Sequence, residues 1–214
     1  MRHGQASFGA ANYDVLSERG HRQARALGEA LRRVGVAPAA LVCGGQRRHR
    51  ETLEGVAAGL GIADERVEAP GLNEFAFGDL LAAHLQDNAL IAELKKDGRA
   101  YFRQMKETVL AWQNDEIAAP PERFSAFQSR VSEAFSELCA RHAGPVVAVS
   151  SGGPIALTTA SVLGAHHREM INLQMQLRNC GIARFIARDG AEQLASFNEA
   201  PHIHAKNRAD MLTY

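Results

Sequence analysis

The chain has 214 residues, of which 46% are hydrophobic and 22% are charged, and a globular chain of this length buries about 70% of the surface that its unfolded form exposes. This composition excludes disordered, collagenous and coiled-coil proteins. Lys and Arg total 24, and Asp and Glu total 24, so no overall field attracts nucleic acid or an anionic membrane, and we expect neither as a partner.

The number and spacing of the cysteines, and the lengths of the apolar runs, indicate in which cell compartment the protein is expected. Cys43, Cys139 and Cys180 lack the spacing of a disulfide framework or a zinc site. The N-terminus has no apolar core of a signal peptide, and no run reaches the 18 or so apolar residues of a membrane span. We therefore expect a cytoplasmic protein.

The predicted elements alternate between helices and strands from the start of the chain. Apolar residues recur at helical spacing over 17–35, where Ser17 is a candidate N-cap and Gly35 a candidate C-terminal stop. The apolar run 39–43 predicts a strand covered on both faces, and a helical pattern over 47–60 follows it.

The middle of the chain is polar and helical. Residues 82–118 contain two polar-rich helical stretches that end before two prolines, which indicates a helical insertion. An amphipathic helix is predicted over 123–142.

The last third contains the strongest local pattern. The run 145–149 (PVVAV) predicts a buried strand, the segment 150–153 a tight turn, and 154–163 a helix with proline in its first turn. A hairpin is predicted over 182–197 with its turn at 188–190. Alternating strands and helices predict an α/β domain with a mainly parallel sheet.

The tripeptide Arg2-His3-Gly4 is the first candidate for chemistry. Small and polar residues follow it, which lets the backbone approach a ligand closely. If the tripeptide follows a strand end, His3 could attack phosphorus, and Arg2 could match phosphate oxygens with its planar donors. A flexible basic N-terminus explains the three residues equally well when they are taken alone.

The segment 46–52 (QRRHRET) follows a predicted strand and opens a predicted helix. An arginine in a first helical turn, beside free backbone N–H groups, is suited to hold a phosphoryl group at the carboxyl edge of a sheet. The alternative is a solvated basic face in which Arg47 pairs with Glu51. Most runs of charged residues form such a solvated face.

Two further segments have the residue types of an active site. Glu74 lies between apolar and aromatic neighbours, and desolvation would raise its pKa and suit it to protonate a leaving group, although a glutamate in a surface loop is the commoner outcome. The turn 150–153 (SSGG) can aim backbone N–H groups at an anion. A serine there can also cap the helix, a contribution of about 1 kcal/mol, and we expect capping as its main role.

Together these segments resemble the histidine phosphatase superfamily, the phosphoglycerate mutase-like group. The resemblance covers nearly the whole chain and rests on the order and spacing of RHGQASF, YDVLSERGHRQARALGEAL, RRHRET, LNEFAFGD, VVAVSSGGPIAL and SFNEAPHI. It implies one domain over 1–214 with a three-layer α/β/α sandwich, a mainly parallel central sheet and helices on both faces. The insertion at about 82–118 would cover the site and set substrate preference.

The resemblance also implies roles for individual residues. His3 would be phosphorylated during turnover, and Glu74 would protonate the leaving alcohol and then help to activate water. The implied phosphate-binding residues are Arg2, Arg48, Ser151 and Gly152, with Ser7 as a possible further one. No metal or organic cofactor is needed, because arginines and helix ends supply positive potential, and His202 with His204 lacks a third metal ligand.

The chain departs from the family's pattern in two places. Ser151 stands where the family has a second histidine, which indicates a subgroup with serine there, and losing one such donor can cost about 10²–10³ in rate. The helical offset of His49 from Arg48 argues against a substitute role for His49. Only Met1 precedes Arg2, so either the chain begins late or His3 lacks the strand that precedes it in the family.

Four functions follow, in order of preference. The first is a phosphomonoesterase that hydrolyses a phosphorylated small molecule or protein through a phosphohistidine, with the phosphorylated substrate or inorganic phosphate as the expected partner. The second is a catalytically impaired phosphate-binding or interaction protein. Phosphoglycerate mutase-type transfer is a weaker alternative, as is an α/β hydrolase that uses Ser151, because the chain lacks the G-x-S-x-G elbow.

Overall fold

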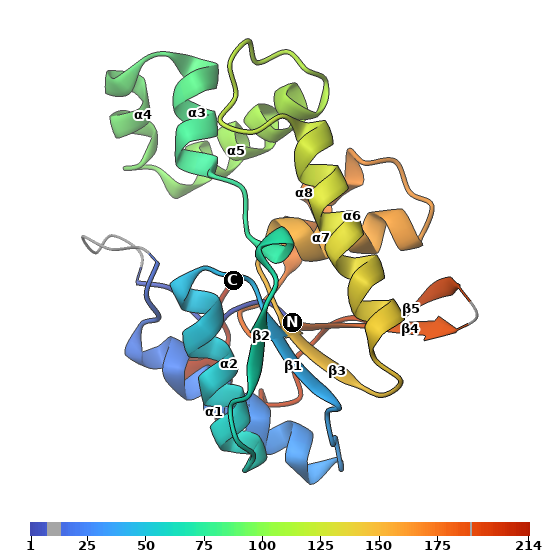
Figure 1. Cartoon of the computed structure of the whole chain (residues 1–214). Coiled ribbons are helices and arrows are strands. Elements are labelled where there is room, and N and C mark those ends of the chain that lie inside the picture. The colour runs from blue at the N-terminus through green and yellow to red at the C-terminus, as the bar shows by residue number, and fades with distance from the viewer. Residues whose placement is uncertain (8–13, 189) are drawn as a thin grey trace.

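A parallel sheet lies at the centre of the fold (Figure 1). The computed structural model describes residues 1–7, 14–188 and 190–214. Within them, β1 (Ala40–Cys43) pairs in parallel with β2 (Arg66–Glu68) on one side and with β3 (Val146–Val149) on the other. The strands at 39–43 and 145–149 are thereby confirmed, whereas β2 has no counterpart in the sequence prediction.

Helices surround the sheet and account for about half of the chain. Their bounds are α1 Glu18–Arg33, α2 Arg47–Leu60, α3 Phe77–Leu85, α4 Asn88–Leu94, α5 Gly98–Gln113, α6 Phe124–Arg141, α7 Gly152–Val162, α8 Glu169–Gln176 and α9 Arg208–Met211, with a 3₁₀ turn at Pro70–Leu72. The helices predicted over 17–35, 47–60, 123–142 and 154–163 are confirmed within a few residues of their ends.

The two faces of the sheet follow from the alternation of side chains along each strand. Leu41 and Val147 point to one face and pack with the apolar residues of α1 and α2. Val42 and Ala148 point to the other face and pack with α6. Helices therefore cover both faces, and the predicted α/β architecture with a parallel sheet is confirmed.

Local signals set the ends of α1. The Ser17 hydroxyl accepts the backbone N–H of Gly20 at 3.1 Å, as the N-cap prediction requires. Gly35 lies just beyond the other end with φ +76°, a conformation that glycine adopts without a steric penalty.

Three helices, α3 to α5, occupy the segment where two helical stretches were predicted, and they gather at the top of the view in Figure 1. They begin at Phe77, earlier than the expected 82, and end at Gln113. An aromatic cluster joins them to the body: the Trp112 ring lies 5.2 Å from Phe124 and 5.3 Å from Phe127, centroid to centroid. The Trp112 indole N–H donates to the Glu122 carbonyl at 2.6 Å.

The C-terminal part contains the predicted hairpin. Strands β4 (Ile182–Arg188) and β5 (Ala191–Glu199) pair antiparallel, and Asp189 of the expected turn lies outside the described residues. In the described part of the chain, no helix has the length and apolar character needed to cross a membrane.

Candidate active site

The predicted site residues meet at the carboxyl ends of the parallel strands, where open α/β sheets place their ligands. The segment 1–3 lies beside the end of β3: Arg2 and Ser150 form a parallel bridge, and the His3 N–H donates to the Ser150 carbonyl at 2.9 Å. On the other side, the Cys180 N–H donates to the His3 carbonyl at 3.2 Å. Arg2 forms an isolated bridge and no strand precedes His3 among the described residues, but hydrogen bonds on both sides hold the His3 backbone.

The His3 ring is buried, with 3% of the residue exposed, and its orientation is fixed. Its Nδ1 lies 2.7 Å from the Gly4 carbonyl oxygen, which can only accept, so Nδ1 carries the ring proton and Nε2 keeps a lone pair. Burial lowers the pKa of His3 well below its usual range, and the charges of Arg2 and Arg48 lower it further. At neutral pH the ring is an uncharged nucleophile beside two cations.

Gly4 joins the His3 segment to α1 and α2. A Cβ on Gly4 would lie 2.6 Å from the Gly20 carbonyl oxygen, so only glycine fits at this contact. The Gly4 N–H donates to the Thr52 hydroxyl at 3.0 Å, and that hydroxyl donates to the Arg48 carbonyl at 2.7 Å. The loop that carries His3 is thereby tied to the first turns of α2.

Arg48 extends into the site from the first turn of α2 and is 6% exposed. Its guanidinium donates to Asp14 Oδ1 at 2.7 Å, to Gln46 Oε1 at 2.8 Å and to Ser151 Oγ at 3.4 Å. Arg2 donates to the Leu177 carbonyl. Arg47 instead forms the exposed pair with Glu51, at 2.6 Å, so the basic run divides between the two expected roles.

Glu74 reaches the N-terminus of α7 from the loop after the 3₁₀ turn. Its Oε2 accepts the Gly153 N–H at 3.0 Å, and its own backbone N–H donates to Gln46 Oε1 at 3.1 Å. Burial raises the pKa of Glu74, while the Gly153 N–H and the charge of Arg48 oppose that rise. The carboxyl group is therefore protonated over a wider pH range than an exposed glutamate, as a proton donor requires.

Ser151 occupies the N-cap position of α7, but its side chain makes no capping hydrogen bond. The Ser150 hydroxyl donates to the Leu72 carbonyl at 2.6 Å, so the expected capping role is wrong for both serines. The Ser151 hydroxyl instead lies 2.7 Å from His49 Nε2, in addition to its contact with Arg48.

Gly152 and Ser7 complete the predicted set. Gly152 is buried at the start of α7, where a Cβ would lie 3.0 Å from Gln174 Cγ. The Ser7 backbone N–H donates to the Val15 carbonyl at 2.9 Å. Among the described residues, no contact joins the Ser7 hydroxyl to the rest of the site.

Sequence reasoning missed Gln46 and His49. Gln46 Oε1 accepts from both Arg48 and the backbone of Glu74, so it connects the two loops that carry these residues. His49 is fully buried, although we expected its offset from Arg48 to exclude it. A signal was present, because Leu53 and Val56 follow His49 at helical spacing and mark the inward face of α2.

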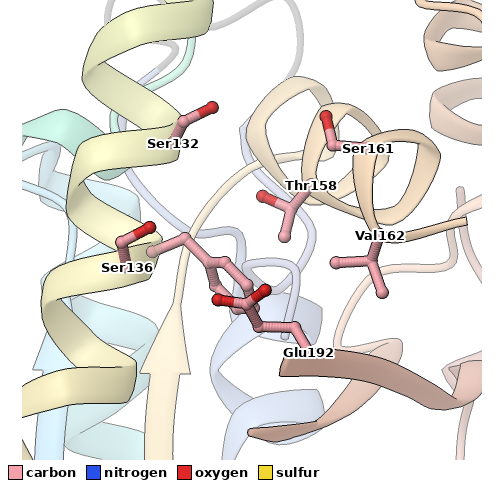
Figure 2. A pocket seen from close by; sticks show the side chains of 7 residues that line it. Ser132, Ser136, Thr158, Ser161, Val162 and Glu192 are labelled. Carbon is pink, nitrogen blue, oxygen red and sulfur yellow. The ribbon is translucent and has the colours of Figure 1, made fainter. Parts of the chain in front are cut away.

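Two other features contribute nothing to this site. No group of three potential metal ligands occurs in the described ranges. A hollow of about 180 Å³ lies between α6, α7 and β5. Figure 2 shows the side chains that line it, Ser132, Phe135, Ser136, Thr158, Ser161, Val162 and Glu192. None of these residues belongs to the site.

The fold and the site define an α/β protein with a buried histidine between arginines at the carboxyl edge of its sheet. The sequence model of the histidine phosphatase superfamily (branch 1) matches residues 1–200. The chain therefore belongs to this superfamily, whose members are mostly phosphatases. The search of curated proteins found no match.

Solved structures of phosphatases share the fold. A phosphoserine phosphatase from Entamoeba histolytica, in complex with phosphoserine, is 20% identical with a TM-score of 0.66, covering 95% of this chain and 96% of that chain. The α-ribazole phosphatase from Shigella flexneri is 24% identical, with a TM-score of 0.65 and coverage of 94% and 95%. A mycobacterial glucosyl-3-phosphoglycerate phosphatase bound to inorganic phosphate is 23% identical, with a TM-score of 0.65 and coverage of 95% and 97%.

Proposed function

We propose that the chain is a phosphomonoesterase that transfers the phosphoryl group of its substrate to His3 and then to water. The observation that carries this proposal is the His3 ring, which is buried beside two arginines with Nδ1 held by the Gly4 carbonyl. A neutral imidazole with a free Nε2 lone pair, in a positively charged surrounding, is suited to attack the phosphorus of a dianion.

In the first step, His3 Nε2 attacks phosphorus in line with the ester bond. The N–P bond forms as the P–O bond to the substrate alcohol breaks. Glu74, whose protonated form is favoured because burial raises its pKa, gives its proton to the leaving oxygen. Arg2, Arg48 and the N–H groups at the start of α7 balance the charge on the equatorial oxygens.

In the second step, water attacks the phosphohistidine. Glu74, now a carboxylate, accepts a proton from this water as its oxygen bonds to phosphorus. The N–P bond breaks, and the electron pair returns to His3 Nε2. Inorganic phosphate leaves, and both His3 and Glu74 regain their starting protonation states.

The proposed substrates are phosphate monoesters of small molecules. The relatives with this fold include phosphatases named for phosphoserine, α-ribazole phosphate and glucosyl-3-phosphoglycerate, and one was solved with inorganic phosphate. Phosphorylated proteins belong to the same chemical class.

A second candidate is a phosphate-binding protein with impaired turnover. Ser151 favours it, because a neutral hydroxyl stands at the position where the resemblance implies a charged imidazole. Such a protein would keep Arg2, Arg48 and the start of α7 for phosphate binding. Phosphate affinity without turnover separates this candidate from the first.

The serine-hydrolase alternative has less support. Ser151 contacts His49 at 2.7 Å, but a triad also needs an acid on the other ring nitrogen. Among the described residues, His49 Nδ1 lies beside Gly44 and contacts no carboxylate. Mutase-type transfer gains no specific support from the site.

The deciding experiment measures phosphate release from an aryl phosphate by the wild-type chain, His3→Ala and Glu74→Gln. The phosphohistidine is detected by rapidly quenching the reaction and measuring the acid-labile phosphate that remains bound to the protein. We expect turnover and trapped phosphate in the wild type and neither in His3→Ala. Undiminished turnover in His3→Ala would refute the proposed nucleophile.

A further inference from the structure

Gln46 is a half-buried polar residue that the proposed mechanism does not use. It occupies the N-cap position of α2, but its side chain makes no capping hydrogen bond to that helix. Asp14 supplies such a bond instead, because its Oδ2 accepts the Arg47 N–H at 2.9 Å. The side-chain amide of Gln46 therefore serves other residues, which its hydrogen bonds identify.

Two donors converge on one atom of the Gln46 side chain. Arg48 Nη2 lies 2.8 Å from Oε1, and the backbone nitrogen of Glu74 lies 3.1 Å from the same atom. A guanidinium and a backbone N–H can only donate, so the atom between them is the amide oxygen, and the orientation of the amide is fixed. One oxygen thus holds the proposed phosphate-binding arginine and the backbone of the proposed proton donor at the same time.

The Arg48 guanidinium is oriented by acceptors on both of its terminal nitrogens. Asp14 Oδ1 accepts from Nη1 at 2.7 Å, and Gln46 Oε1 accepts from Nη2 at 2.8 Å. The Ser151 hydroxyl is a more distant acceptor from Nη2, at 3.4 Å. Because a guanidinium is planar, acceptors on two nitrogens fix its plane, and that plane decides which phosphoryl oxygens it meets. Loss of the Gln46 oxygen removes the short bond to Nη2 and loosens this orientation.

The loop that carries Glu74 is joined to the start of α2 by two hydrogen bonds that run in opposite directions. The Gly45 N–H donates to Asn73 Oδ1 at 2.7 Å, and the Glu74 N–H donates to Gln46 Oε1 at 3.1 Å. The second bond acts on Glu74 itself, whose carboxylate accepts the Gly153 N–H at 3.0 Å. The position of the Glu74 backbone, and with it the reach of the carboxyl group, therefore depends on the Gln46 amide.

We propose that Gln46 is a positioning residue that couples phosphate binding by Arg48 to proton donation by Glu74. The inference rests on the proposed function and adds to it that both tasks share one hydrogen-bond acceptor. When the Gln46 oxygen orients the arginine for the phosphoryl group, the same oxygen places the acid for the leaving group. Gln46 acts through these two residues, and the role requires no contact between Gln46 and the substrate.

Gln46→Met tests the shared acceptor, because methionine has a similar length and no amide oxygen. We expect inhibition by inorganic phosphate to weaken by about 10-fold, the low end of the value of hydrogen bonds to charged groups. We expect kcat to fall by about 10²-fold for glycerol phosphate, whose leaving group needs a proton, and by less for nitrophenyl phosphate. The bond between Gly45 and Asn73 remains and keeps the two loops joined. A smaller fraction of folded enzyme would instead lower both rates equally.

Further variants separate the two contacts of the Gln46 oxygen. In an Arg48→Ala background, Gln46→Met should weaken phosphate inhibition no further, because the residue that it orients is gone. The ratio of the two rates should still change, because the bond to Glu74 is lost. Gln46→Ala removes the same oxygen and carries the test if Gln46→Met fails to fold. Gln128→Met is the matched control, since Gln128 is exposed on α6; it should change neither phosphate inhibition nor the ratio of rates.

The outcomes distinguish this inference from the function on which it rests. If the loss of the Gln46 oxygen changes only phosphate inhibition, only the ratio of rates, or neither, then Gln46 does not couple the two residues and the inference is overturned. Turnover that is lost in His3→Ala still supports the phosphatase in each of these cases. If the wild type turns over neither phosphate ester, the proposed function fails, and the role of Gln46 fails with it.

Discussion

The Glu74 carboxylate lies against the backbone of Gly153, with Oε2 accepting the Gly153 N–H at 3.0 Å. A Cβ at position 153 would lie 2.1 Å from Glu74 Oε1, closer than any real contact. The absence of a side chain at Gly153 is therefore what lets the proposed proton donor reach the start of α7.

Gly153→Ala should displace the Glu74 carboxyl group by an ångström or more. Because misplacement of about 1 Å can cost roughly 10²-fold in rate, we expect a loss of that size in kcat. The loss should be larger for alkyl phosphates, whose leaving groups need a proton, than for nitrophenyl phosphate. Kinetics with both substrates measure this difference.

Gly98→Ala is the control for Gly153→Ala. Gly98 opens α5, and nothing lies within 4 Å of its would-be Cβ. This change should leave kcat unaltered and stabilise the helix slightly, by up to about 1 kcal/mol. Equal effects at both glycines would contradict the role assigned to Gly153.

Arg48 is buried and its neighbour Arg47 is exposed. Their alanine variants should therefore differ in how strongly inorganic phosphate inhibits them. Arg48→Ala removes a buried guanidinium from the site and should weaken inhibition by inorganic phosphate by roughly 10–100-fold, the value of charged hydrogen bonds. Arg47→Ala removes an ion pair with Glu51 in which the arginine is largely exposed, and such pairs are worth little. If Arg47→Ala weakens phosphate inhibition as much as Arg48→Ala does, Arg48 is not the phosphate ligand.

The parts of the fold that the sequence predicted are those set by local signals. Helix α1 begins at a capping serine and ends before a glycine with positive φ, and both signals lie within its own segment. β2 escaped prediction because Arg66 and Glu68 are polar and partly exposed. Only pairing with β1, distant in sequence, makes this segment a strand.

The same distinction applies to the site. The candidates His3, Arg48 and Glu74 were found because each stands in a recognisable local pattern, and the structure brings them together. The contact between His49 and Ser151 joins residues 102 positions apart. The offset from Arg48 alone did not reveal it, whereas the inward face of α2 marked by Leu53 and Val56 would have.

Buried histidines should make the folded protein sensitive to mild acid. Burial lowers the pKa of His3, of His49 to about 3 and of His202 to about 4. In the unfolded chain these rings take up protons below about pH 6.5, while the folded chain keeps them neutral. Acid therefore favours unfolding, and each histidine contributes a slope of about 1.4 kcal/mol per pH unit below that value.

Urea unfolding at several pH values measures this slope. The free energy of unfolding should reach its full value above pH 7 and should fall as the pH drops from about 6.5 toward 4. Glu74 acts in the opposite sense, because its raised pKa favours the folded state as it becomes protonated. His202→Phe removes one buried histidine and should reduce the slope of unfolding free energy against pH by the contribution of one histidine, about 1.4 kcal/mol per pH unit. An unchanged slope would show that His202 titrates normally in the folded protein.

Moving the imidazole from position 49 to position 151 tests which side chain fills the space beside Arg48. Ser151→His alone should not improve activity, because Ser151 is fully buried and its Oγ already lies 2.7 Å from the His49 ring, so a second ring is overpacked at a cost of about 1–3 kcal/mol. Adding His49→Ala makes room, and the double variant should recover the lost thermal stability and exceed Ser151→His in kcat. If Ser151→His alone is stable and faster than the wild type, then His49 does not fill that space, and the hydroxyl at position 151 is simply the weaker donor.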